Sequence, residues 1–213
     1  MYKLSAFMLI VFLPMLGTAQ NKKYVSSMEK NLKMMDTCQS IASYQQVANA
    51  FERICSAEKK EWLPPYYVAL CNTFMATMSA GDKIDEYCDI ADRYAARGDS
   101  LNPNNSELCA LHALICSSRI SVNPMLRGAK FGGKSGEYSA KAMQLDSTNP
   151  RPYLLQGQGK FYTPPQFGGG KDKAQPTIAK AVKKYEAFKP ASTIAPNWGK
   201  ERAKMLLEEC NKK

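Results

Sequence analysis

One short segment of this chain occurs twice, and the spacing of its two copies restricts the folds that the chain can adopt. The segment Lys130–Lys134 (KFGGK) returns as Gln166–Lys171 (QFGGGK), with its phenylalanine 36 residues further on. A repeat of this length is typical of helical hairpins that stack into a solenoid. Ala, Leu, Met, Lys and Glu are abundant, and these residues favour helix over strand.

Apolar residues recur at helical spacing in nine segments. In the segment 42–58, for example, Val47, Phe51 and Ile54 form a single apolar stripe. Short connections with turn residues, such as Ser79–Asp82, separate the segments. The pattern predicts helices near residues 23–36, 42–58, 64–79, 82–98, 104–121, 134–146, 150–161, 171–188 and 196–211. We therefore predict an all-α fold of antiparallel helical hairpins.

Two of these hairpins resemble the tetratricopeptide repeat, over about residues 82–188. The matching positions are Ala91, Leu101, Pro103, Ala142, Leu145, Asp146, Tyr153 and Gly157. Gly98 and Ser147 depart from the pattern, where the repeat usually has Ala and Pro. The Phe-Gly-Gly loops and the ending Pro196–Gly199 are similar to exported bacterial members of this family. The resemblance implies that the hairpins stack as a short right-handed TPR-like solenoid with a concave groove.

The N-terminus has the features of a secretory signal peptide. Lys3 precedes an apolar run, Leu4–Leu16, which is too short to span a bilayer comfortably. The small residues Gly17–Ala19 follow it and predict cleavage after Ala19. The sequence thus predicts a signal peptide over residues 1–19 and a helical-repeat domain over residues 20–213, without a membrane span. We expect the mature protein to be exported, either to the periplasm or out of the cell.

The net charge of +10 lies in the C-terminal half of the chain. Residues 20–121 carry 11 Lys/Arg and 12 Asp/Glu, whereas residues 122–213 carry 17 and 7. A basic surface can attract nucleic acid, an anionic membrane or an acidic partner, or it can simply keep the protein soluble. An exported protein meets little nucleic acid, so we expect no nucleic-acid partner. An acidic protein and a solvated lysine surface remain as alternatives.

The cysteines allow two interpretations. The first four of them recur at intervals of 17, 16 and 17 residues, about one in each helix, where small buried thiols would let helices approach closely. In an oxidising compartment some of them could instead form disulfides. The seven are Cys38, Cys55, Cys71, Cys88, Cys109, Cys116 and Cys210. Since no CxxC motif occurs and His112 is the only histidine, we expect no metal site.

One motif raises the possibility of nucleotide binding. Gly128–Ser135 satisfies G-x-x-x-x-G-K-[ST], in which a strand must deliver a glycine-rich loop to the phosphates. The preceding residues do not form a strand pattern, and an exported protein meets little ATP. We therefore expect an accidental match, no enzymatic activity and no cofactor. In this interpretation Phe131 and Phe167 fill gaps between stacked helices, and the glycines form turns into the next helix.

The resemblance also suggests a function and a site. The groove of a tetratricopeptide solenoid is lined by the first helix of each hairpin, which here places Arg151, Gln158 and Tyr162 in the groove, with Arg119 beside it. Such a groove suits an extended peptide or a chain end. We accordingly predict a non-enzymatic scaffold that binds a protein or peptide. The alternative is an exported small-ligand binder of a transport system, with its pocket under the two Phe-Gly-Gly loops.

Overall fold

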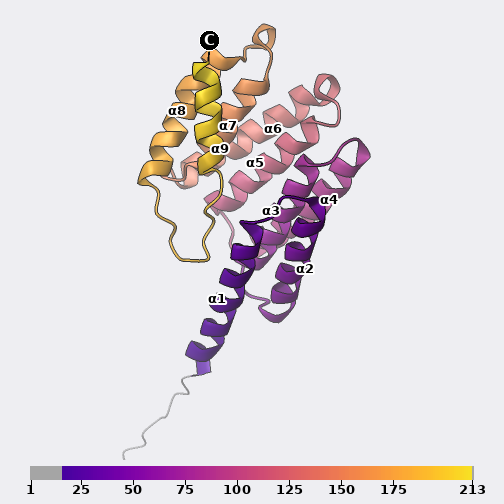
Figure 1. Cartoon of the computed structure of the whole chain (residues 1–213), viewed down its shortest axis with the longest axis vertical. Helices are drawn as coiled ribbons and strands as arrows, with labels where there is room; N and C mark the ends of the chain where they lie inside the picture. The colour runs from indigo at the N-terminus through magenta and orange to yellow at the C-terminus, as the bar shows by residue number, and fades with distance from the viewer. Residues whose placement is uncertain (1–15, 213) are drawn as a thin grey trace, which may run out of the picture.

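A computed structural model describes residues 16–212 of the chain and shows an all-helical protein, as predicted (Figure 1). No helix in these residues is both long and apolar enough to cross a membrane. The helices are α1 (Leu16–Met35), α2 (Ile41–Ala57), α3 (Leu63–Thr77), α4 (Asp82–Leu101), α5 (Ser106–Ile120), α6 (Pro124–Leu145), α7 (Arg151–Tyr162), α8 (Lys171–Ala187) and α9 (Lys200–Asn211), with a 3-10 turn at Pro165–Phe167. Residues 1–15, which hold most of the predicted signal peptide, lie outside the described residues.

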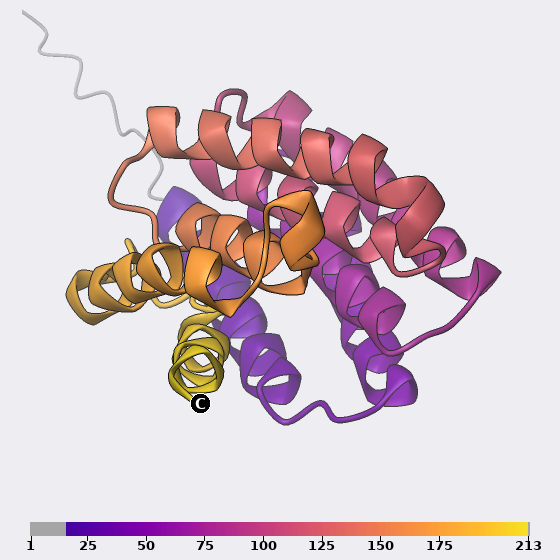
Figure 2. The same cartoon turned by 90° about the horizontal axis from the view of Figure 1, so that it is seen from above.

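Consecutive helices pack side by side, from α1 and α2 at one end of the molecule to α8 and α9 at the other (Figures 1 and 2). Contacts of α5 with both α3 and α7 join the hairpins to one another. The helix α3 lies between α2, α4 and α5, and nearly all of its residues are therefore buried. The larger core is built around α2, α3 and α5, and a smaller core joins α7, α8 and α9.

Short polar residues begin several of the helices. Ser40 accepts the backbone N–H of Ser43 and starts α2 with a capping box. The side chain of Asn105 accepts the N–H groups of the first turn of α5, and that of Asn123 does the same for α6. These caps fix where each hairpin turns, and they explain why the predicted boundaries of α2 and α5 are close to the observed ones.

The nucleotide-binding motif does not form a loop. The helix α6 begins at Pro124, ten residues before the predicted start, and continues through the whole of Gly128–Ser135. Ser135 is buried and hydrogen-bonds the carbonyl of Ala113 at 2.9 Å. A continuous helix cannot wrap its backbone N–H groups around a phosphate. The match is accidental, as expected.

The second copy of the repeated segment has a different conformation. Residues 165–170 leave the helical path, with Gly168 and Gly170 at φ of 83° and 101°. Here the prediction of glycine turns is correct, whereas in the first copy the glycines are helical. The side chain of Phe167 is 63% exposed, so the prediction that it fills a gap between helices is wrong. The two copies therefore share a sequence but not a structure.

All seven cysteines are free thiols, which agrees with the first of the two interpretations. Five are buried: Cys55, Cys71, Cys88, Cys109 and Cys116. Burial raises the pKa of the Cys55 thiol to about 11, although Arg97 opposes this shift. These cysteines act as small apolar side chains in the core.

A buried arginine binds the connection between α8 and α9 to the rest of the protein. Arg151, at the start of α7, is 0% exposed and donates to the Glu107 carboxylate at 2.8 Å. It also donates to the carbonyl of Pro196, and its guanidinium lies 4.9 Å from the centre of the Phe188 ring. Pro196 and Phe188 belong to the connection between α8 and α9, which we call the strap (residues 188–199).

Tyrosine hydroxyls hold the strap at two further points. Tyr67 of α3 donates to the carbonyl of Ile194 at 2.8 Å, and its neighbour Tyr66 accepts the indole N–H of Trp198 at 2.7 Å. Residues more than a hundred positions apart thus meet in one buried polar cluster. The cluster joins the strap to both α3 and α7.

Gly157 allows α7 and α8 to approach each other closely, and we expect its replacement to be costly. A Cβ atom there would lie 2.6 Å from Cγ1 of Ile178 and 3.2 Å from its backbone nitrogen. Gly157→Ala should therefore destabilise the fold by about 1–3 kcal/mol in urea denaturation. Gly159 of the same helix is the matched control, because a Cβ there meets nothing within 4 Å. Gly159→Ala should stabilise by up to about 1 kcal/mol; equal effects of the two changes would contradict this account.

Candidate functional site

The structure does not place Arg119 or Arg151 in an open groove. Arg119 is held by carboxylates of α4, with Asp85 at 3.0 Å and both Asp89 and Asp92 at 2.7 Å. Arg151 is enclosed in the cluster that holds the strap. A buried, paired guanidinium cannot meet an extended peptide. Both arginines stabilise contacts between helices in this structure.

The other two predicted residues lie near the surface of the C-terminal helices. Tyr162 is 61% exposed, and its hydroxyl accepts a hydrogen bond from Arg202. Arg202 also approaches the side-chain oxygen of Gln158, at 3.5 Å. These two residues therefore share one partner on α9, away from Arg119 on α5.

His112 does not offer an open metal ligand. Its Nε2 lies 2.8 Å from the Asp99 carboxylate, and its ring stacks on Tyr138 at 4.9 Å between centres. The side chain is 12% exposed. His112 is therefore a packed histidine on the mostly buried helix α5.

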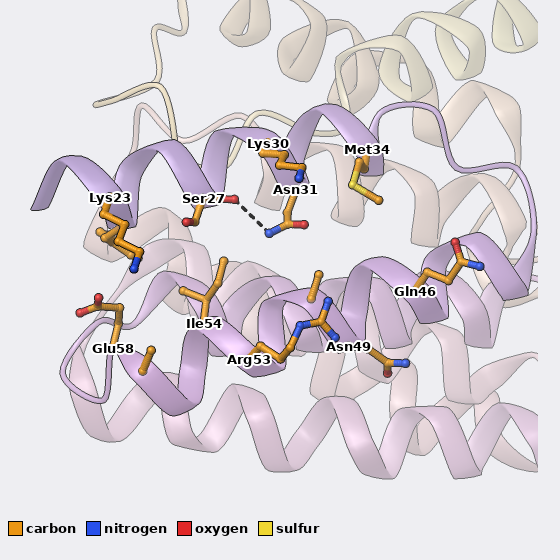
Figure 3. A pocket seen from close by; sticks show the side chains of 13 residues that line it. Lys23, Ser27, Lys30, Asn31, Met34, Gln46, Asn49, Arg53, Ile54 and Glu58 are labelled. Carbon is orange, nitrogen blue, oxygen red and sulfur yellow. Dashed lines mark hydrogen bonds between the residues drawn. The ribbon is translucent and has the colours of Figure 1, made fainter. Parts of the chain in front are cut away.

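A groove lies between α1 and α2 and has a volume of about 840 Å³ (Figure 3). One face of α1 supplies Lys23, Tyr24, Ser27, Lys30, Asn31 and Met34. The opposite wall of α2 supplies Gln46, Asn49, Ala50, Arg53, Ile54 and Ala57, and Glu58 lies at its end. Small-molecule sites commonly enclose about 300–1,000 Å³, so the groove is large enough for a sizeable ligand.

Helical spacing explains how the groove forms. On α1, Met28 is completely buried and packs into the main core together with Tyr24. On α2, Val47, Phe51 and Ile54 turn toward the same core. The groove-lining residues of α1 recur three or four positions apart and therefore lie on one face of the helix. This face lies opposite α2 across the groove.

The groove combines an apolar floor with cationic walls. Ala50 and Ile54 are the buried apolar residues of the lining, 8% and 9% exposed, and we call them the floor. Met34 is 40% exposed. Lys30 and Arg53 are both solvent-exposed residues of the lining. Such a surface suits a ligand that is largely apolar and carries negative charge at its edge.

Tyr24 lines the groove and carries a buried polar atom without a hydrogen-bond partner among the described residues. This atom is the side-chain hydroxyl, and the residue is 7% exposed. Burial raises the pKa of this hydroxyl well above its ordinary value, and the nearby carboxylates of Glu61 and Glu58 add to the effect. Tyr24 therefore remains a neutral phenol with an unused donor.

No separate signal in the sequence indicates this groove. Lys23, Ser27, Lys30 and Asn31 recur at helical spacing, but the same pattern is typical of a solvated helix face. The alternative prediction places a ligand pocket under the two Phe-Gly-Gly loops. Phe167 is exposed in its loop, and the groove lies elsewhere, between α1 and α2.

Comparison with known proteins gives one informative relative. The fold matches the solved structure of the HusA haemophore from Porphyromonas gingivalis with a TM-score of 0.81 and 35% sequence identity, over 92% of this chain and 94% of that chain. Neither a protein-family model nor a curated protein sequence matches the chain. The predicted protein- or peptide-binding scaffold is wrong on this finding, because the relative is a haemophore. The match supports a helical fold but does not show a tetratricopeptide protein.

Proposed function

This chain belongs to the family of the HusA haemophore, and we propose that it is an exported, non-enzymatic protein that binds haem in the groove between α1 and α2. The observation that carries the proposal is the similarity to the HusA haemophore over nearly the whole length of both chains. Haem takes the place of the peptide partner predicted from the sequence. It agrees with the alternative prediction, a small-ligand binder. The predicted signal peptide agrees with this role, since a haemophore acts outside the cytoplasm.

The residues of the groove fit the chemistry of haem. A porphyrin is a flat apolar ring with two propionates at one edge, and it would find an apolar floor at Ala50 and Ile54. Haem iron in proteins is held by His, Cys, Met or Tyr. His112 and the cysteines do not line the groove, whereas Met34 and Tyr24 do. Met34 is the more accessible of the two and would be the first candidate to contact the iron.

We expect a bulky side chain in the groove to block haem. Ser27 lies on the groove face of α1, so Ser27→Trp should lower the affinity for haem at least about tenfold by occupying the ligand's space. The measurement is a titration with haemin followed by the Soret band. Ser26, the exposed preceding residue, does not line the groove and provides the control Ser26→Trp.

The outcomes separate the function from its location. A wild-type protein that gives no saturable spectral change with haemin would refute haem binding. Saturable binding that Ser27→Trp and Ser26→Trp leave equally intact would place the haem site elsewhere in the molecule. Circular dichroism of both variants would show whether they keep the helical fold.

A further inference from the structure

The residues that line the groove carry a net positive charge. Lys23, Lys30 and Arg53 line it, and Glu58 is its one carboxylate. None of the three cationic side chains forms an ion pair with another described residue. Figure 3 shows Lys23 and Glu58 facing each other at one end of the groove. Glu58 thus compensates Lys23 in part, and the positive charge that remains belongs to Lys30 and Arg53.

These two cations come from opposite walls. Lys30 extends from α1 and Arg53 from α2, in the middle part of the groove (Figure 3). The side chains of Ser27 and Asn31 beside Lys30 are neutral, and Asn31 donates to the carbonyl of Ser27 at 2.9 Å. Glu58, the one carboxylate of the lining, lies at the Lys23 end (Figure 3), so Lys30 and Arg53 have no counter-charge within the groove. An anionic group placed between the two walls would supply one.

The floor below the cations is apolar, which restricts the anion that the site can hold. Ala50 and Ile54 offer no polar side-chain atom to a small inorganic ion, and neighbouring Ala57 offers none either. A ligand that satisfies both parts of the groove needs an apolar body for the floor and carboxylates for the walls. A tetrapyrrole with two free propionates has this combination.

We propose that Lys30 and Arg53 are the specificity-determining residues of the groove and select tetrapyrroles with free carboxylates over esterified ones. The proposal rests on the proposed function, because it concerns the same groove. Lys30 provides a compact ammonium from one wall, and Arg53 provides a planar guanidinium that can bind a carboxylate with two parallel hydrogen bonds. The two propionates of one ligand would then bridge α1 and α2.

The test compares haemin with haemin dimethyl ester, which has the same ring and iron but no acidic groups. Wild-type protein should bind the diacid roughly 10- to 100-fold more tightly, as expected for charge-assisted hydrogen bonds. Lys30→Gln and Arg53→Gln should each lower the affinity for the diacid roughly tenfold and leave that for the ester unchanged. Both residues are exposed, so neither change should disturb folding.

Lys33→Gln is the matched control, because Lys33 is an exposed lysine of α1 outside the groove lining. It should bind both ligands as the wild type does. Equal affinity of the wild-type protein for diacid and ester would overturn the proposal while leaving haem binding intact. A loss with Lys33→Gln as large as with Lys30→Gln would also overturn it, since the effect would then be diffuse attraction. Binding of neither ligand would refute the proposed function itself.

Discussion

Replacing Arg151 by methionine should destabilise the protein by about 3–5 kcal/mol at pH 8. The guanidinium is completely buried, and it pairs with Glu107 and with the carbonyl of Pro196. Methionine would fill much of the space but leave the carboxylate without its cation in a region away from water. Removal of one partner of a buried ion pair is costly because the other charge stays buried and uncompensated.

Urea denaturation of Arg151→Met beside Lys183→Met measures this effect. Lys183 is an exposed lysine of α8, and its replacement should change stability by less than about 0.5 kcal/mol. A loss below about 1 kcal/mol for Arg151→Met would contradict a structural role for the buried pair. An Arg151 that binds a partner from an open groove, as the resemblance to tetratricopeptide repeats implies, would instead give near-equal stability of the two variants.

The second large effect concerns pH. Burial raises the pKa of Glu107 to about 7 from an ordinary value of 4.5, against the opposing effect of Arg151. Between these two pH values the unfolded chain has released the proton while the folded chain still holds it. Stability due to this group is therefore full below about pH 4.5 and falls as the pH rises to about 7. At about 1.4 kcal/mol per pH unit, the loss amounts to at most about 3 kcal/mol.

Glu107→Gln should remove this pH dependence, since the amide does not ionise. The measurement is the free energy of unfolding of both proteins between pH 4.5 and 8. The difference between the two proteins at each pH reports on Glu107, because the other carboxylates contribute equally to both. Glu137→Gln on the exposed face of α6 is the control and should follow the wild type. A constant difference between wild type and Glu107→Gln across this range would show that Glu107 is ionised throughout in the folded protein.

The sequence predicts helices well where a local signal controls them. The segment 42–58 corresponds to α2 because Ser40 caps it and its apolar stripe meets α3. The predicted start of α6 at residue 134 is wrong, because the glycines of 128–133 lie within the helix. Each glycine costs a helix about 1 kcal/mol, but the cap at Asn123 and the packing on α5 outweigh that local cost.

The site could not be predicted in the same way, because it depends on contacts between distant residues. Nothing near Arg151 in the sequence shows that Glu107, 44 residues earlier, will bury it. Equally, the polar face of α1 resembles any solvated helix until α2 is placed opposite to it. The similarity to a haemophore, rather than the pattern of residues, is the reason why we propose a ligand site on this face.

The unlinked state of the cysteines has a consequence for where this protein can mature. All seven are free, and five are enclosed in the core, where burial keeps them as protonated thiols that react slowly with oxidants. The described residues hold no disulfide on which the fold would depend. The same native state should therefore form in reducing and in oxidising surroundings.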